Sequence, residues 1–182
     1  MCLGGIVSRT LKATSGVPQG SHFEPLLFSL FINDLCDELV ESEFLLYADD
    51  LKLYRKMTSL HDAAALQRDL DRVNNWCQRN AMQLNVAKCE TITFTRRAVP
   101  DLVTVDYAIT SQRLRRVNNV KDLGIHIDSR LTFKPQVNHV VSWGKSMLGF
   151  MKRLSRVFNC PHVTKSLYCS LVRPLLEYAA VV

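Results

Sequence analysis

Two adjacent carboxylates, Asp49 and Asp50, are the residues of this chain whose placement most directly suggests metal chemistry. Residues 44–47 (Phe-Leu-Leu-Tyr) and 51–54 (Leu-Lys-Leu-Tyr) flank them, and both runs have the composition of β-strands. The intervening Ala48-Asp49-Asp50 is short enough for a hairpin turn. Such a tip would offer hard oxygen ligands to Mg²⁺, which takes one or two carboxylates together with substrate phosphates. The alternative is an ordinary surface turn, which aspartate favours through local hydrogen bonds.

Upstream of this pair, residues 15–21 read Ser-Gly-Val-Pro-Gln-Gly-Ser. Glycine and proline at alternate positions interrupt regular structure and predict a loop. Beyond the loop, apolar residues recur every three or four positions from Pro25 to about Leu39, which predicts a well-buried helix. Pro25 suits the first helical turn, and Ser21 is a candidate upstream cap.

A further helix is predicted from Ser59 to about Asn80. Its apolar residues form one stripe that would pack on a sheet, and its charged residues are expected to face outward. The stripe comprises Leu66, Leu70, Val73, Trp76 and Cys77, and the outward set comprises Arg68, Asp69, Asp71 and Arg72.

Residues 15–21 and 47–50 (Tyr-Ala-Asp-Asp), in this order and at this spacing, resemble the polymerase core of non-LTR (LINE-type) retrotransposon reverse transcriptases. Matches continue downstream, so the resemblance covers nearly the whole chain. It implies an α+β fold in which residues 1–128 form part of a reverse-transcriptase palm, an antiparallel sheet with packed helices. Residues 129–182 would follow as a basic, helical, thumb-like segment.

The resemblance also implies an activity, that of an RNA-directed DNA polymerase whose nucleotidyl transfer uses two metal ions, Mg²⁺ or alternatively Mn²⁺. Asp49 would be a principal metal ligand and Asp50 would support it. Gln19 and Gly20 would shape the pocket for the incoming nucleotide, although a loop that only caps the following helix is the alternative. Lys88 would lie near the leaving pyrophosphate, with a solvated surface cation as an equal alternative.

Residues 120–128 resemble the segment of this family that grips the primer end, centred on Leu123-Gly124. Glycine within a strand suggests the close approach of another backbone at Gly124. The implied partners are therefore an RNA template, a DNA primer and deoxynucleoside triphosphates.

Charge divides unevenly along the chain. Residues 1–128 carry 15 Lys and Arg against 16 Asp and Glu, whereas residues 129–182 carry 8 against 1. A segment of one sign favours binding to a phosphate backbone, because a merely solvated helical face usually mixes both signs. A helix predicted over residues 135–158 would turn its apolar residues inward, and a second helix would begin near Pro161 and kink at Pro174. The inward set is Val137, Val140, Val141, Met147, Leu148, Met151 and Leu154, and the basic set left on one side is Lys145, Lys152, Arg153 and Arg156.

Two features distinguish the chain from an intact polymerase of this family. Glu24 stands where the family usually has glycine, and a carboxylate near the triphosphate path would repel substrate. No Asp or Glu precedes Glu24, so the upstream aspartate that completes the two-metal site is missing from this sequence. We therefore expect a fragment without the N-terminal polymerase and endonuclease regions, inactive by itself. The alternative is a catalytically dead remnant that binds nucleic acid.

Nothing in the sequence indicates a membrane or an oxidising compartment. No apolar run approaches the roughly 20 residues of a membrane span, and the N-terminus lacks the basic region of a signal peptide. The six cysteines show no zinc-binding spacing. These features predict an intracellular protein, nuclear or cytoplasmic.

Overall fold

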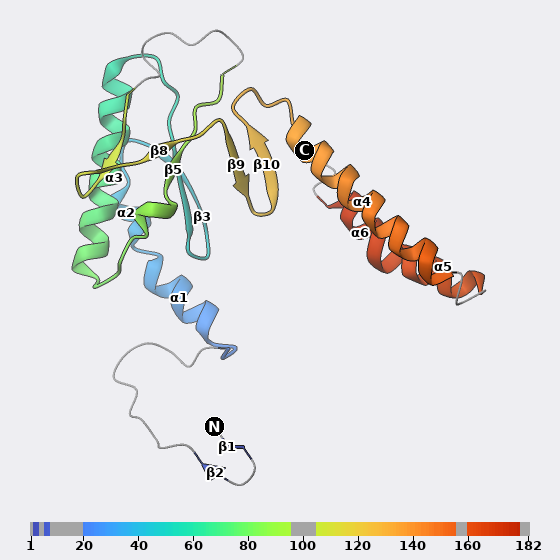
Figure 1. Ribbon diagram of the computed structural model, residues 1–182. Helices are drawn as coiled ribbons and strands as arrows, with labels where there is room; N and C mark the ends of the chain where they lie inside the picture. The colour runs from blue at the N-terminus through green and yellow to red at the C-terminus, as the bar shows by residue number, and fades with distance from the viewer. Residues whose placement is uncertain (1, 4–5, 8–19, 96–104, 156–159, 179–182) are drawn as a thin grey trace. The chain divides into compact units, whose positions relative to one another are not determined.

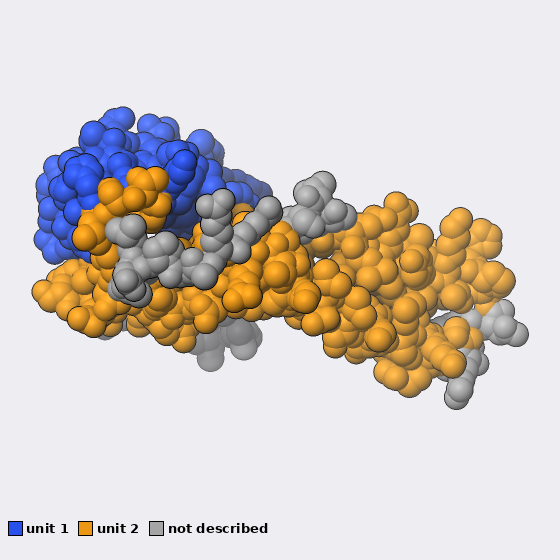
Figure 2. All heavy atoms as spheres, turned by 90° about the horizontal axis from the view of Figure 1, so that it is seen from above, with its two compact units in different colours: residues 1–56, 61–83 blue, residues 57–60, 84–182 orange. Residues whose placement is uncertain are grey.

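The computed structural model describes residues 2–3, 6–7, 20–95, 105–155 and 160–178. The chain forms two compact units, which Figure 2 distinguishes by colour. Unit 1 comprises residues 1–56 and 61–83, and unit 2 comprises residues 57–60 and 84–182. The two units are defined by contacts within each of them, and this division does not test the predicted domains. The assignment of residues 1–128 to a palm and 129–182 to a thumb therefore stays a prediction.

Unit 1 contains short antiparallel hairpins and helices (Figure 1). Strand β3 pairs with β4 in an antiparallel hairpin, so the predicted hairpin around the two aspartates is present. Its elements are β1 (Cys2–Leu3), β2 (Ile6–Val7), α1 (Glu24–Ile32), α2 (Leu35–Glu38), β3 (Glu43–Tyr47), β4 (Asp50–Tyr54) and α3 (Leu60–Arg79).

The prediction of one well-buried helix from Pro25 to Leu39 is wrong in two respects. Helix α1 ends at Ile32, and α2 starts only at Leu35. Most of the apolar side chains of α1 are exposed, because the packing within unit 1 reaches only its C-terminal end, where the ring of Phe31 meets Trp76 of α3 at a centroid distance of 5.7 Å. Ile32 and Leu35 are the buried members of this segment.

Helix α3 has the predicted position but not the predicted outer face. Val73, Trp76 and Cys77 are buried as expected. Asp69, expected to face solvent, is completely buried. Its carboxylate accepts hydrogen bonds from the backbone N–H groups of Val40 (3.4 Å) and Glu41 (3.0 Å), just before β3. The helix therefore holds the base of the β3–β4 hairpin through a buried anion.

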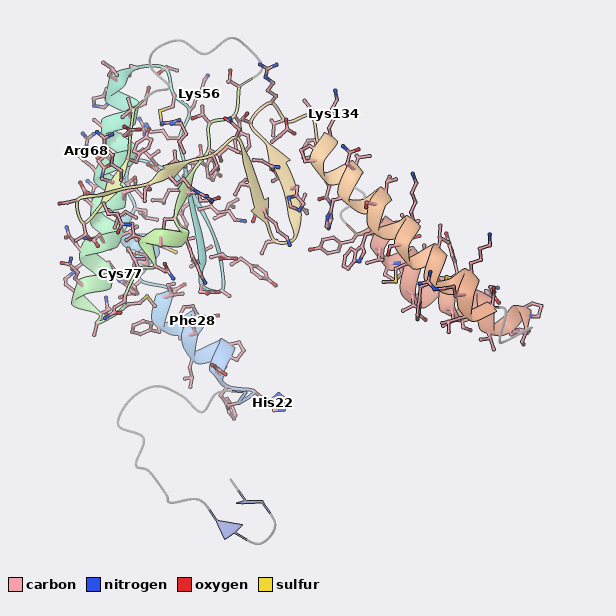
Figure 3. All side chains as sticks on the ribbon, in the orientation of Figure 1. His22, Phe28, Lys56, Arg68, Cys77 and Lys134 are labelled. Atoms are coloured by element: carbon pink, nitrogen blue, oxygen red, sulfur yellow. The ribbon has the colours of Figure 1, made fainter. Side chains whose placement is uncertain are left out.

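Two arginines of α3 complete this anchor. Arg72 donates to Asp69 at 2.5 Å, and Arg68 donates to the carboxylate of Glu41 at 2.7 and 2.5 Å. Figure 3 labels Arg68 on this helix. Although burial alone would raise the pKa of Asp69, the hydrogen bonds from Arg72 and the two backbone amides hold that pKa below its ordinary value. Asp69 is thus ionised and fully engaged.

Unit 2 begins with short strands and ends with helices (Figure 1). Strands β9 and β10 form an antiparallel hairpin, whereas β5 and β8 pair in parallel. The elements are η1 (Val86–Lys88), β5 (Glu90–Thr91), β6 (Ala108–Ile109), β7 (Gln112–Arg113), β8 (Arg115–Arg116), β9 (Asn119–Asp122), β10 (Ile125–Asp128), α4 (Lys134–Ser155), α5 (Pro161–Leu167), η3 (Tyr168–Val172) and α6 (Arg173–Glu177).

Helices α4 and α6 run side by side because a glycine lets them approach closely (Figure 1). A Cβ at Gly144 would meet Cδ2 of Leu176 at 3.0 Å. The inward face of α4 comprises Gln136, Val140, Gly144, Met147 and Met151. The prediction that Val137, Val141 and Leu148 face inward is therefore wrong, since all three are exposed.

The helical segment that begins at Pro161 changes its helical geometry next to Pro174, where the kink was predicted. After α5, residues Tyr168–Val172 form a π-helical turn, and α6 then starts with Pro174 in its first turn. Proline lacks the N–H of a regular helical hydrogen bond and its ring crowds the preceding turn, so a wider turn at this point is expected. Within the described residues, no helix is both long and apolar enough to cross a membrane.

Candidate functional site

The tip of the β3–β4 hairpin presents the two adjacent carboxylates. Tyr47 pairs with Asp50, so Ala48 and Asp49 form a two-residue turn and Asp50 is the first residue of β4. Ala48 has a φ of 50°, and a positive φ at the first loop residue is what the tight hairpin turns require. Asp50 shares a face of the hairpin with Tyr47, whose side chain is 65% exposed. The turn thus fixes the backbone beneath both carboxylates.

Both carboxylates face solvent, and no other described residue forms a hydrogen bond or ion pair with either of them. Two adjacent, unpaired anions repel each other and attract a cation. Their oxygens match the preference of Mg²⁺ or Mn²⁺, so the donor chemistry fits these metals. The described residues contain no cluster of three or more metal-binding side chains, and the pair is therefore a partial ligand set.

The predicted nucleotide-pocket residues lie at the start of α1. Gln19 falls outside the described residues, whereas Gly20 has a φ of +81°, a conformation that glycine adopts without strain. The N–H of Gly20 donates to Glu24 Oε2 at 2.7 Å. Ser21 is not the predicted helix cap: its Oγ accepts from the N–H of Phe23 at 3.2 Å, and Phe23 occupies the N-cap position. Glu24 therefore has a local structural partner.

Lys88 ends the short 3₁₀ turn η1 and is exposed. Its backbone N–H donates to the carbonyl of Asn85 at 3.0 Å, so this local turn fixes its backbone position. Lys88 belongs to unit 2, whereas Asp49 and Asp50 belong to unit 1. Its assignment to the pyrophosphate remains a prediction.

Leu123 and Gly124 form the two-residue turn that joins β9 to β10. Both have positive φ values, 44° and 88°, as in a type I′ hairpin. The prediction that Gly124 lies inside a strand next to another backbone is wrong. A Cβ at this position would lie 3.5 Å from the ring of Tyr178, so a side chain is the close neighbour.

The basic side chains of α4 lie outside its packed face. Lys134, Lys145 and Lys152 are separated by 11 and 7 residues, which places them on one side of a helix, and all three are exposed (Figure 3 labels Lys134). At 1.5 Å per residue this row spans about 27 Å. Arg153 is also exposed, whereas Arg156 lies outside the described residues.

Sequence reasoning missed two residues of these surfaces. Lys134 could have been found from its spacing to Lys145 and Lys152, but the helix was predicted to start one residue later. Tyr178 could not have been found, because its contact with the Leu123-Gly124 turn joins segments 55 residues apart and leaves no local pattern.

Comparison with known proteins identifies what this chain resembles. A family model described as reverse transcriptase (RNA-dependent DNA polymerase) matches residues 3–127. The RNA-directed DNA polymerase from mobile element jockey of Drosophila funebris is 32% identical over 175 residues, an alignment that covers 91% of this chain and 19% of that protein. The probable RNA-directed DNA polymerase from transposon BS of Drosophila melanogaster is 33% identical over 139 residues, covering 72% of this chain and 15% of that protein.

The same chain is 28% identical over 186 residues to the jockey polymerase of Drosophila melanogaster, with 96% of this chain and 20% of that protein aligned. The chain thus spans about one fifth of the length of the jockey polymerases that it matches. No solved structure matches it.

Proposed function

Because this chain belongs to the reverse transcriptase family, in the non-LTR retrotransposon group, we propose that it is part of the catalytic domain of an RNA-directed DNA polymerase. One observation supports this most: the hairpin tip presents the exposed, unpaired Asp49 and Asp50 on a fixed turn. Phosphoryl transfer depends on positioning and on neutralising charge with metal ions, and an acidic hairpin tip suits both tasks.

In this proposal Asp49 and Asp50 hold part of a divalent metal site, with Mg²⁺ preferred and Mn²⁺ as a substitute. Bound ions would neutralise the phosphates of the incoming nucleotide. Gln19 and Gly20 line the path of that nucleotide, and Lys88 faces the leaving pyrophosphate. Residues 1–128 serve as part of the palm, and residues 129–182 serve as the start of a thumb.

The exposed lysines of α4 bind the template–primer duplex in this scheme. Phosphate contacts make such binding independent of sequence and weak at high salt. On duplex DNA, the logarithm of the binding constant falls with the logarithm of the salt concentration, with a slope of about −0.9 for each phosphate neutralised. Lys145 and Lys152 are exposed and lie roughly a quarter turn around α4 from the packed Gly144, so they are free to reach a backbone.

Binding to an RNA–DNA hybrid at several salt concentrations tests this surface. The double variant Lys145→Ala with Lys152→Ala should bind the hybrid with a shallower salt dependence, and the slope should fall by the amount expected for one to two phosphate contacts. The matched control, Arg113→Ala with Arg115→Ala, also removes two positive charges, but these arginines form ion pairs with Asp106 and Glu90. Equal effects of the two double variants would show that α4 is not the binding surface.

Primer extension tests the catalytic proposal. The site needs a carboxylate from a second strand, and the sequence before Glu24 contains none, so the 182-residue chain alone should extend no primer with Mg²⁺ or Mn²⁺. A longer polypeptide of this family that joins this chain to a segment supplying the aspartate should extend one. Incorporation by the 182-residue chain, abolished by Asp49→Ala, would contradict the requirement for a further segment.

A second candidate function, a nucleic-acid-binding remnant without catalysis, is favoured by a separate pair of observations. Asp49 and Asp50 lack a third described ligand, while the basic side of α4 is intact. Failure of the longer polypeptide to extend a primer, together with salt-dependent hybrid binding, would favour this candidate. Restored extension after Glu24→Gly would instead show that Glu24 blocks the nucleotide path.

A further inference from the structure

We propose that Tyr178 is a positioning residue that holds the Leu123-Gly124 turn in place for the 3′ end of a nucleic-acid primer. The role of the turn rests on the proposed function and on the resemblance of residues 120–128 to the segment that grips the primer end, whereas the contact that holds the turn is independent of both. The Tyr178 hydroxyl donates a hydrogen bond of 2.5 Å to the carbonyl oxygen of Leu123.

The turn needs such support because its hairpin has few partners of its own. Strands β9 and β10 pair only with each other within the described sheets, and an isolated two-stranded hairpin is marginally stable in water. Leu123 adds strain, since its φ of 44° places a side-chain-bearing residue in the left-handed region. Without an outside contact, this tip would sample several conformations.

Strand β10 of the hairpin is fixed on α4. The N–H of His126 donates to Oε1 of the buried Gln136 at 2.9 Å. The ring of His126 also lies 5.0 Å from that of His139, which in turn lies 5.8 Å from Trp143. These contacts hold β10 against the helix but leave the turn to be held by other residues.

The tip is fixed by the segment that follows α6. Gly144 lets Leu176 reach the surface of α4, which places the end of α6 beside that helix. Helix α6 ends at Glu177, and Tyr178 adopts an extended conformation while its N–H donates to the carbonyl of Pro174 at 3.0 Å. Its ring then lies against Gly124, where a Cβ would meet ring atom Cε1 at 3.5 Å.

The side chain left available at this held tip is apolar. Leu123 is 44% exposed, and its carbonyl is occupied by Tyr178, so the turn offers a leucine side chain to a ligand. A fixed apolar contact suits the sugar face of a terminal nucleotide, while the lysines of α4 contact phosphates. Residues 120–128 resemble the segment that grips the primer end in this family, so the ligand class in this proposal is a duplex with a recessed 3′ end, in preference to a blunt duplex.

Tyr178→Phe removes the hydroxyl and keeps the ring, so it tests the contact without unfolding the chain. We expect hydrogen exchange in residues 119–128 of the 182-residue chain to become about three- to tenfold faster, the range for one lost hydrogen bond. Tyr168→Phe is the matched control, because it removes a hydroxyl from the same helical segment. Equal exchange rates in the two variants would overturn the claim that the Tyr178 hydroxyl holds the Leu123-Gly124 turn.

The positioning role is tested by binding, which does not require catalysis. The unmodified chain should prefer a DNA primer recessed on an RNA template over a blunt hybrid of equal duplex length. Tyr178→Phe should reduce this preference by about three- to tenfold and leave blunt-hybrid binding unchanged. Leu123→Gly, which relieves the turn but removes the side chain, should abolish the preference.

The two readouts separate the inference from the proposed function. Faster exchange with an unchanged end preference would overturn the positioning role. Binding to the hybrid without any end preference in the unmodified chain would overturn it as well. No hybrid binding at all would contradict the proposed function, while the exchange measurement would still decide whether Tyr178 holds the turn.

Discussion

The two hairpins that carry the candidate residues are alike in backbone and opposite in how they are held. The β3–β4 and β9–β10 hairpins each close with a two-residue turn, and each has a residue other than glycine at positive φ, Ala48 and Leu123. The first is anchored at its base by Asp69 and presents bare carboxylates at its tip. The second is held along strand β10 by Gln136 and at its tip by Tyr178.

This difference matches the two tasks that we assign to them. A metal-binding tip must leave its anions free of protein cations, because an ion pair would compete with the metal. A tip that positions a primer end must not move, so contacts from other elements are an advantage. In keeping with this, Arg68 and Arg72 of unit 1 pair with Glu41 and Asp69 at the hairpin base, away from the two carboxylates of the tip.

The largest expected effect concerns the anchor of the first hairpin. Asp69→Ala would leave the N–H groups of Val40 and Glu41 and the guanidinium of Arg72 without their buried acceptor. Breaking a buried ion pair costs about 3–5 kcal/mol in the free energy of unfolding. Chemical denaturation should show this loss, whereas Asp71→Ala, an exposed site on the same helix, should change stability by less than about 0.5 kcal/mol. Similar losses for both variants would mean that Asp69 is not the anchor.

Acid should release the same anchor. Burial would raise the pKa of Asp69, but its hydrogen bonds lower it overall, and the hydrogen bond from Arg68 lowers the pKa of Glu41. A carboxyl group with a lowered pKa stabilises the folded state above its unfolded pKa, near 4, and loses this contribution as pH falls through the folded value. Thermal unfolding should therefore occur at lower temperature below about pH 4. Asp69→Asn should show a smaller fall with acid than the unmodified chain, and an unchanged fall would contradict the assignment.

A glycine substitution at the second tip should have an intermediate effect. Gly124→Ala would place a side chain at a φ of +88° and against the ring of Tyr178. The left-handed conformation alone costs about 1–2 kcal/mol for such a residue. Hydrogen exchange in residues 119–128 should speed up accordingly. Gly149→Ala, at a helical position of α4 where a Cβ would have only an ordinary contact, is the control and should not destabilise the hairpin.

The reverse substitution at the first tip should have the smallest effect. Ala48→Gly relieves strain of about 1–2 kcal/mol, but glycine costs about 0.5–1 kcal/mol in backbone entropy. A net gain between zero and about 1.5 kcal/mol should appear in chemical denaturation. A loss of stability would show that the turn does not need its positive φ at this position.

Sequence patterns correctly predicted the elements whose formation depends on residues close together in the chain. The strand-like composition of the runs on both sides of Asp49, with a short turn between them, predicted a hairpin, and the apolar period predicted α3 to within one residue at each end. The structure differs where distant segments meet. The helical pattern of α3 predicts Asp69 at the surface, because only the folded chain brings the amides of Val40 and Glu41 to its carboxylate.

The same limit applies to the candidate site. Sequence reasoning found Leu123-Gly124 but expected a strand, because two positive φ values in succession depend on the closing of β9 onto β10. It expected Val137 and Leu148 to be buried, because a period identifies an apolar stripe without showing how much of it a neighbour covers. Helix α6 is only five residues long and meets α4 at Gly144, so Val137 and Leu148 remain exposed beside this contact.

The most direct test of the central claim separates chemistry from binding at the first hairpin. In a longer reverse transcriptase polypeptide that contains this chain and extends primers, Asp49→Ala should reduce primer extension by a hundredfold or more. The affinity for the template–primer hybrid should stay unchanged. The expected size follows because loss of a metal ligand removes at least as much transition-state stabilisation as loss of an oxyanion donor, about 2.7–4 kcal/mol. Asp37→Ala, an exposed aspartate of α2, is the control and should retain full extension. Extension that survives Asp49→Ala, or that falls equally with Asp37→Ala, would contradict the assignment of the catalytic metal site to this hairpin.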